Sequence, residues 1–556
     1  MRKLSGLAAL LGMAFGFSIQ AADSPLAQIS DEADVVIRIR AFNATIEKVA
    51  ALANAVQPGT GDLVSQNATA FGLALSNPAL SGVDRSKDFY LVLFMREDGE
   101  PKALFAIPTT DGPALQKALP ENFESQVRDN WVFYADKDHG VPTAVSASDS
   151  FQEVLNDTAA SKVFENSDIG LHVNLRHIAD IYDAKIQEGR QKFEEGIQQG
   201  LNTPGVANAA GTVEMLKIQA DMAFKLLEET ETLTVGLTAT PTGLEIEDFI
   251  DFQKDSEIAA FLKKQPTSAF DGLTNLGAGL PLYMGISAEF SDLAGMAEKL
   301  TATLYQDEAV RQGMKDYITT LKTHKVTSAV MSFDLASGTK GLFRSTAFME
   351  TKSAADFLTA ARQFAKVSQT IKIGEMTQET KLEQDAETVG THQIDLMTIT
   401  QKVDPSQPGA AMQTMMTGIM FGPQGIQTRM TALADGMLQV QGGDKSTMEA
   451  ALKAYDAKAN SLNEVRNGLT AESHLLMLFD LPGLVSQGLL AATTIPGIPV
   501  PFQRAAVEDL QIARSYTATT AVGEEHALRI KTRIPVEQFQ GVLKLVSFAQ
   551  SIHGGR

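Results

Sequence analysis

Cysteine is absent from all 556 residues of the chain. Its absence excludes a disulfide framework and a thiolate zinc site, and it leaves no cysteine for lipid modification after a signal sequence. A secreted eukaryotic protein of this length usually carries disulfides. A chain with a secretion signal and no cysteine is therefore more typical of a bacterial envelope protein, either periplasmic or on the outer surface.

Basic side chains are also scarce, because 47 Lys and Arg face 67 Asp and Glu, which gives a net charge of −20. A general nucleic-acid binder needs a basic surface for phosphates, so this balance argues against nucleic acid as a partner. It equally argues against docking on anionic lipid by charge alone. The acidity mainly keeps the protein soluble.

Long apolar runs are confined to the N-terminus, where residues 1–21 have the order of a signal peptide. Arg2 and Lys3 form the basic region, and the apolar stretch 4–17 is too short to span a bilayer stably. Small residues before Ala22 offer a cleavage site. Removal of Arg2 and Lys3 would shift the net charge from −20 to −22. We expect an exported protein, in the periplasm, on the outer surface or secreted, with no transmembrane span in the mature chain.

The clearest pattern in the remaining chain is a hairpin followed by a short helix, seen at 233–264. Apolar and polar residues alternate over 233–239, which indicates a half-buried strand. Pro241 and Gly243 then favour a turn, because proline fixes φ and glycine tolerates a positive φ. Asp255 and Ser256 supply oxygen acceptors where a helix would begin.

This unit occurs four times in all, with a lone strand before each hairpin. The predicted hairpins pair 89–95 with 102–107, 233–239 with 244–252, 327–334 with 342–349 and 514–522 with 526–534. The helices that follow them are predicted at 112–119, 257–264, 354–364 and 536–548, and the lone strands at 35–39, 169–175, 282–288 and 474–479. Further strands are expected at 131–134, 380–384, 393–400 and 437–441, with helices at 151–156 and 446–454.

These repeats predict an α+β fold built by tandem duplication of strand–helix–hairpin–helix units, with antiparallel sheets covered by helices. The first half spans 22–270 and the second half 280–556. Glycines and Pro266 punctuate the boundary between them. Apolar residues at helical spacing over 176–230 predict a helical hairpin in the first half. Its apolar stripes are expected to pack on each other or on the sheet, or else to form an arm that grips another protein.

Motifs that carry catalysis or bind metals are nearly missing. His172 and His177 are five residues apart, which does not place two zinc ligands on one helical face. The tetrapeptide 337–340 matches a Ser-x-x-Lys pattern but falls on a predicted hairpin turn. The segment that begins at Asp136 resembles a calcium loop but has Ala147 where the bidentate glutamate belongs. We therefore predict no catalytic, cofactor-binding or metal-binding residues, although distant carboxylates could still assemble into a site.

Two uncharged segments stand out in the second half, at 405–428 and 481–503. The first is rich in methionine, a flexible residue that recurs on adaptable apolar binding surfaces. Prolines exclude a continuous membrane-spanning helix in the second. Both segments could be core or interdomain packing. Alternatively they form an apolar binding surface, for which the candidate residues are Met412, Met415, Met416, Met420, Phe421, Ile495, Ile498, Val500 and Phe502.

Architecture and composition thus favour an exported protein of the bacterial envelope that binds or scaffolds other molecules without catalysis, with a protein or an apolar ligand as possible partner. A periplasmic carrier for lipid or another apolar ligand is the second interpretation, and an enzyme of unrecognised type is the third. No cofactor is expected. A co-purifying lipid would distinguish the second interpretation, and a hydrolytic activity lost on mutation of a carboxylate would distinguish the third.

The first testable prediction concerns the signal sequence. Protein isolated from the native envelope should begin at Ala22 or an adjacent residue, because cleavage follows the small residues that end the signal. N-terminal sequencing of that protein checks the prediction. Cytoplasmic protein that retains Met1 would contradict it.

Overall fold

A computed structural model of the chain describes residues 24–74, 77–97, 99–156, 158–201, 210–289, 307–324, 326, 328–336, 340–373, 376–403, 410–458, 460, 462–466, 468–495 and 499–554. Several predictions fall outside these residues. They are the signal sequence, residues 202–209 of the predicted helical hairpin, most of the Ser-x-x-Lys match and Ile498. Contacts divide the chain into two compact units, one formed by residues 1–50, 61–181 and 234–236 and the other by 51–60, 182–233 and 237–556.

The first unit contains a six-stranded antiparallel sheet in the order β4–β5–β3–β2–β1–β6. Its strands are β1 (Val35–Ile39), β2 (Phe89–Phe94), β3 (Lys102–Pro108), β4 (Phe123–Arg128), β5 (Trp131–Asp136) and β6 (Ile169–Asn174). Its helices are η2 (Pro25–Gln28), α2 (Phe42–Val56), α3 (Thr60–Ala74), α4 (Gly112–Ala118), η3 (Ala147–Asp149), α5 (Phe151–Leu155), α6 (Ala159–Asn166) and α7 (Leu175–Ile181), of which α2 and α3 each include residues of the second unit.

Strand β5 shows that this sheet is covered on both faces. Trp131 and Phe133 belong to one hydrophobic cluster, with Phe151 and Phe164 from α5 and α6. The alternate residues Val132 and Tyr134 belong to another cluster, with residues of α2 and α4. Because successive side chains of a strand point to opposite faces, a strand buried along its whole length needs cover on both sides.

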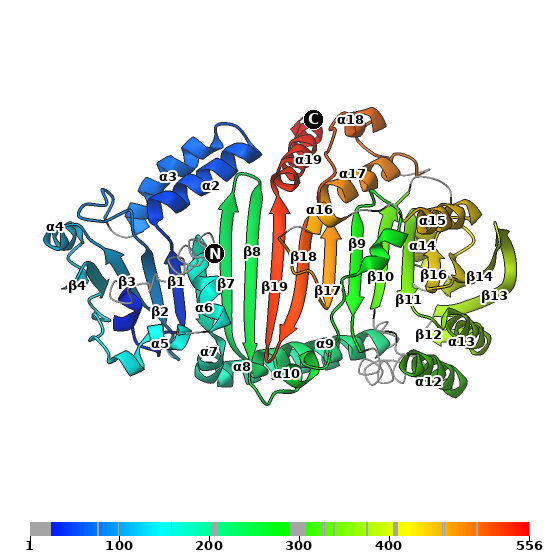
Figure 1. The fold of residues 1–556 in the computed structure, drawn as a ribbon, viewed down its shortest axis with the longest axis horizontal. Helices are drawn as coiled ribbons and strands as arrows, with labels where there is room; N and C mark the ends of the chain where they lie inside the picture. The colour runs from blue at the N-terminus through cyan, green and yellow to red at the C-terminus, as the bar shows by residue number, and fades with distance from the viewer. Residues whose placement is uncertain are drawn as a thin grey trace, which may run out of the picture. The chain divides into compact units, whose positions relative to one another are not determined.

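The second unit contains a twelve-stranded antiparallel sheet, in the order β8–β19–β18–β17–β9–β10–β11–β16–β15–β14–β13–β12 (Figure 1). Its strands are β8 (Gly243–Phe252), β9 (Leu282–Ser287), β10 (Ser328–Leu335), β11 (Phe343–Glu350), β12 (Thr370–Ile373), β13 (Met376–Val389), β14 (His392–Val403), β15 (Ile426–Ala432), β16 (Gly436–Gln441), β17 (Leu475–Phe479), β18 (Thr517–Glu524) and β19 (Ala527–Pro535). Strand β7 (Thr230–Thr240) has residues in both units.

The helices of the second unit pack on this sheet and on one another. They are α8 (Asp183–Leu201), α9 (Ala210–Glu229), α10 (Glu257–Leu262), η4 (Asp271–Asn275), α12 (Glu308–Thr323), α13 (Ala354–Val367), α14 (Ala410–Phe421), α15 (Lys445–Ala457), α16 (Asn463–Arg466), α17 (Leu481–Ala492), α18 (Arg504–Glu508) and α19 (Val536–Gly554). The largest core lies between the central strands, η4 and α15, where Tyr283, Phe348 and Met448 are fully buried. Among the residues that the structure describes, each helix is either too short or too polar to traverse a bilayer.

The predicted hairpins and lone strands are present, with ends shifted by a few residues. Three strands were missed, namely β4, β12 and β15. The strands predicted at 380–384 and 393–400 are parts of the much longer β13 and β14. These long strands carry many polar and charged residues, so apolar alternation marked only their centres.

Ion pairs distant in sequence hold the polar strands β13 and β14 in place. The Arg362 guanidinium of α13 donates to both carboxylate oxygens of buried Asp395, at 2.6 and 2.8 Å. Arg429 of β15 makes the same two-pronged contact with Glu387, at 2.9 and 3.0 Å. Bidentate pairs of this kind fix orientation as well as charge.

The turn between β7 and β8 generates a second testable prediction. Gly243 has φ +155°, and a Cβ added there would lie 2.3 Å from the Ile534 carbonyl oxygen of β19. Backbone atoms cannot yield as a flexible side chain does. Gly243→Val should therefore lower the free energy of unfolding by at least about 1 kcal/mol.

Urea denaturation checks this prediction, with Gly189→Ala in α8 as the control. A Cβ at Gly189 would meet nothing within 4 Å, and alanine is the better helix former, so the control should be neutral or slightly stabilised. An unchanged unfolding midpoint for Gly243→Val would mean that the turn adopts another conformation.

A candidate apolar binding surface on the second unit

The end of the β10–β11 hairpin brings the two uncharged segments to one face of the sheet. Leu335 pairs with Phe343 in the antiparallel register, and Phe333 pairs with Ser345. Paired residues share a face, so Phe333, Leu335 and Phe343 lie on the same side of the hairpin. The rings of Phe333 and Phe343 are 5.1 Å apart.

Helix α14 is attached to this face by its C-terminal end. The Phe421 ring lies 5.4 Å from the Phe343 ring, and the Leu342 amide donates to the Ile419 carbonyl oxygen at 3.1 Å. The sequence marked this segment as uncharged but did not predict a helix there. The apolar residues of this helix are distributed around its whole circumference. It therefore lacks the one-sided pattern by which an amphipathic helix is recognised.

The predicted methionines of α14 point largely into solvent. Met412, Met415 and Met416 are 67%, 53% and 49% exposed. Their spacing places them on one stripe of the helix. Met420 and Phe421 are half-buried at the end that touches the hairpin. The helix thus has an anchored end and an exposed apolar end.

Helix α17, in the other uncharged segment, reaches the same face of the hairpin. Gly488 lies against Leu335, since a Cβ there would be 3.8 Å from the Leu335 Cδ1 atom. Leu481 and Val485, one turn apart, are 42% and 39% exposed. The structure therefore brings α14 and α17 onto one apolar patch of β10 and β11, although the two helices are some 60 residues apart in sequence.

The remaining predicted residues follow α17 and are arranged differently. Ile495 and Val500 are half-buried, and Ile498 lies outside the described residues. The half-buried Phe502 packs its ring 5.5 Å from Phe548 of α19. Phe502 is thus joined to α19 rather than to the β10–β11 hairpin.

Helix α19 is an apolar element whose exposure sequence reasoning missed. Val542, Leu543 and Val546 are each more than a third exposed. Close packing on α17 occurs at Gly541, where an added Cβ would lie 2.6 Å from Pro482. The scarcity of charge in this helix could have indicated an apolar surface, because Lys544 is the only Lys, Arg, Asp or Glu between Gln538 and the end of the helix.

A buried carboxylate fixes α17 relative to α19. Asp480 caps α17 by accepting from the Gly483 amide at 2.9 Å, and the same oxygen accepts from Gln538 of α19 at 3.3 Å. Its second oxygen lies 3.1 Å from Arg514. A capping residue of this kind typically stabilises a helix by about 1 kcal/mol. Here Asp480 also holds α17 against α19.

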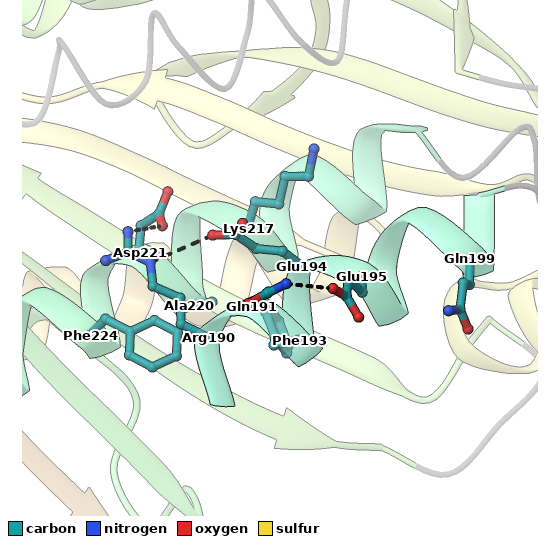
Figure 2. A pocket seen from close by; sticks show the side chains of 10 residues that line it. All are labelled: Arg190, Gln191, Phe193, Glu194, Glu195, Gln199, Lys217, Ala220, Asp221 and Phe224. Atoms are coloured by element: carbon teal, nitrogen blue, oxygen red, sulfur yellow. Dashed lines mark hydrogen bonds and ion pairs between the residues drawn. The ribbon is translucent and has the colours of Figure 1, made fainter. Parts of the chain in front are cut away.

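A polar cleft of about 560 Å³ lies along α8 and α9 (Figure 2). Arg190 stacks over the Phe224 ring at 5.3 Å and lies 3.3 Å from Asp221 and 3.6 Å from Glu194. Phe193 and Leu216 of these helices remain more than a third exposed. The charges of the cleft pair with one another, as expected of two helices packed through solvated side chains.

Residues considered for chemistry are separated in the structure. His172 is buried, with Nδ1 2.8 Å from the Thr234 hydroxyl, whereas His177 Nδ1 lies 2.6 Å from a carboxylate oxygen of Asp34. The Asp136 side chain accepts from the Asp138 amide at 3.1 Å and so closes a turn. Over the described part of the chain, no three His, Asp or Glu side chains gather as metal ligands would.

No family model matches the sequence, and no curated protein matches it. Among solved structures, crystal forms III and IV of TP0453 are 12% and 10% identical to this chain. They cover 49% and 50% of this chain and are themselves covered to 97% and 100%, with TM-scores of 0.21 and 0.22. Similarity at this level carries no argument about fold or function.

Buried His172 generates a third testable prediction, on the dependence of stability on pH. Burial lowers the pKa of His172 from 6.5 to about 4. Between these values the unfolded chain binds a proton that the folded chain does not, so acidification through this range destabilises the fold. The loss should reach about 3 kcal/mol by pH 4.

Thermal melts from pH 7 to pH 4 check this dependence. His172→Gln should flatten the fall in melting temperature, whatever its own effect on stability at pH 7. His139→Gln, in the polar turn after β5, should leave the slope unchanged. Equal slopes for wild type and His172→Gln would contradict the prediction.

Proposed function

We propose that this chain is an exported protein of the bacterial envelope that binds a protein partner, without catalysis, through an uncharged helical surface. We define this surface by the exposed side chains of α14, α17 and α19. They are Met412, Met415, Met416, Leu481, Val485, Val542, Leu543 and Val546. The observation that carries the proposal is the exposed methionine stripe of α14.

Exposure of this methionine stripe to water is unfavourable in free energy. Apolar area left in water forgoes about 25 cal/mol for each Å² that could be buried. Single exposed apolar residues scattered over a surface are normal, whereas here three exposed methionines are grouped on one short helix. Methionine is unbranched and polarisable, so it adapts to the shape of a partner. A partner that covers the stripe would recover this free energy.

A carrier for lipid or another apolar ligand is the second candidate. Four described clefts include charged side chains, and each opens to solvent, which fits an enclosed apolar ligand poorly. An exposed surface on helices suits a protein partner better. An enzyme of unrecognised type is the third candidate, and no described cluster of side chains favours it.

We further propose that the chain is a tandem duplication, with halves 22–270 and 280–556. Strand pairing supports this proposal. The lone strand β1 pairs with β2 and β6, and β9 likewise pairs with β10 and β17. The second hairpin strands also correspond, since β3 pairs with β5 and β11 with β16. An experimental structure with a different pairing order in the two halves would contradict the proposal.

The fourth testable prediction introduces a charge on the uncharged helical surface. Met416→Asp and Val485→Asp should each fold normally, because both side chains are exposed and polar substitutions there cost little stability. Binding should weaken sharply, since a partner would have to bury an unpaired carboxylate.

Affinity purification from the native envelope, followed by mass spectrometry of co-purifying proteins and lipids, measures the effect. Leu63→Asp on α3 is the matched control, because Leu63 is 57% exposed and lies outside the uncharged segments. Loss of a stoichiometric protein from both variants, but not from the control, is the expected result. Collapse of both variants would show that the helices are ordinary core, and unaltered co-purification would remove the binding surface. Loss of a lipid instead would favour the carrier.

A further inference from the structure

The β10–β11 hairpin also lines a cleft of about 380 Å³, mainly through the face that alternates with Leu335 and Phe343. It lies between the two strands, the loop after η4 and the first turns of α15. Its polar lining consists of Ser332, Asp334, Arg344, Ser345, Thr346, Ser446 and Thr447. The volume falls within the range of about 300–1,000 Å³ typical of small-molecule sites.

Side-chain alternation explains why these polar groups face inward. Val330, two residues before Ser332, and Phe348, two residues after Thr346, both belong to the main core. Residues two apart on a strand share a face. The cleft is therefore a continuation of the core, in which one buried and several half-buried polar side chains replace apolar ones.

Two of these polar groups lack partners within the described part of the chain. Ser332 is only 2% exposed, and neither its hydroxyl nor one carboxylate oxygen of Asp334 has a hydrogen-bond partner there. A buried polar atom left without a partner is unfavourable, because it has lost its hydrogen bonds to water. Unsatisfied groups in a cavity are the arrangement expected of a site that a ligand completes.

Arg344 stands directly opposite Asp334 in the strand register but does not use it as its hydrogen-bond partner. The Arg344 guanidinium instead donates to the carbonyl oxygens of Phe343, at 2.8 Å, and Lys340, at 3.5 Å. Burial lowers the pKa of Arg344, and the nearby Asp334 carboxylate opposes this effect. The cleft thus holds one cationic and one anionic group, each with capacity left for a bound molecule.

We propose that this cleft binds a small zwitterion of the α-amino-acid class. The ligand carboxylate accepts from the Arg344 guanidinium, which matches its planar geometry. The ligand ammonium group donates to the free oxygen of Asp334. Ser332 and Thr346 supply hydroxyl groups between these two charges, and Ala450 and Ala451 of α15 offer an apolar wall for a small side chain.

Charge complementarity favours this ligand over a neutral sugar. A sugar could use the hydroxyl groups but would leave the two charges of the cleft without counter-charges, which is costly in a partly buried site. A zwitterion neutralises both while adding no net charge. The charged groups of this site, Asp334 and Arg344, belong to the other face of the hairpin from Leu335 and Phe343, so they differ from the residues that hold α14 and α17, although Phe333 also lines the cleft.

Calorimetric titration of the purified mature protein tests the fifth prediction. The probes are L-alanine, L-serine and L-valine, compared with N-acetyl-L-alanine, L-alanine amide and D-glucose. Free amino acids should bind saturably, and blocking either end should weaken binding at least about tenfold, because each block removes one ionic contact. This comparison uses the wild-type chain and so does not depend on whether a variant folds.

Substitutions then assign the two ends. Asp334→Asn and Arg344→Lys should each weaken binding of free L-alanine at least tenfold, while Asp356→Asn, on the exposed face of α13, should leave it unchanged. Ser332→Ala removes an unpartnered hydroxyl and should weaken binding without loss of melting temperature. The proposal is overturned by the absence of saturable binding to any free amino acid, by blocked derivatives that bind as well, or by binding of glucose alone.

Discussion

The two-residue alternation of β10 and β11 is the constraint on which both proposed sites depend. Hydrogen bonding fixes the register of these strands, so each side chain is committed to one face of the sheet. Phe333, Leu335 and Phe343 receive the helices α14 and α17 on one face, while Ser332, Asp334 and Arg344 line a cleft on the other. A slip of one residue would exchange the faces and remove both sites at once.

The same register explains how uncharged helices are held without being buried. Helix α14 is fixed mainly at its C-terminal end, by Phe421, and α17 is fixed by the Asp480 cap and by Gly488. These contacts involve few residues, so the remaining apolar surface of both helices stays accessible. A buried polar contact such as the Asp480 cap specifies the position of a helix more than it adds stability.

The sequence predicted much of the sheet because strands and turns are local signals. Alternation at 233–239, the Pro241–Gly243 turn and the Ser256 cap were each recognisable within a few residues, and Ser256 does cap α10. Long-range partners were not recognisable. No residue near Arg429 in the sequence indicates that it pairs with Glu387. Likewise, no residue near Ser332 indicates that it shares a cleft with Arg344 and Thr447. The candidate apolar residues were nominated by the absence of charge, but which of them are exposed depends on packing with β10, β11 and α19.

The pairing of β19 with β8 has a consequence for how the chain is made. β19 lies between β8 and β18, yet its residues are among the last thirty of the chain. Until they are synthesised and released, β8 and β18 each expose a row of unpaired backbone groups. Such edges invite association with other chains, and for β8 the hazard lasts until β19 has followed it, more than 270 residues later. A chain that crosses a membrane unfolded and folds only on the far side would complete this pairing once β19 has followed β8 across.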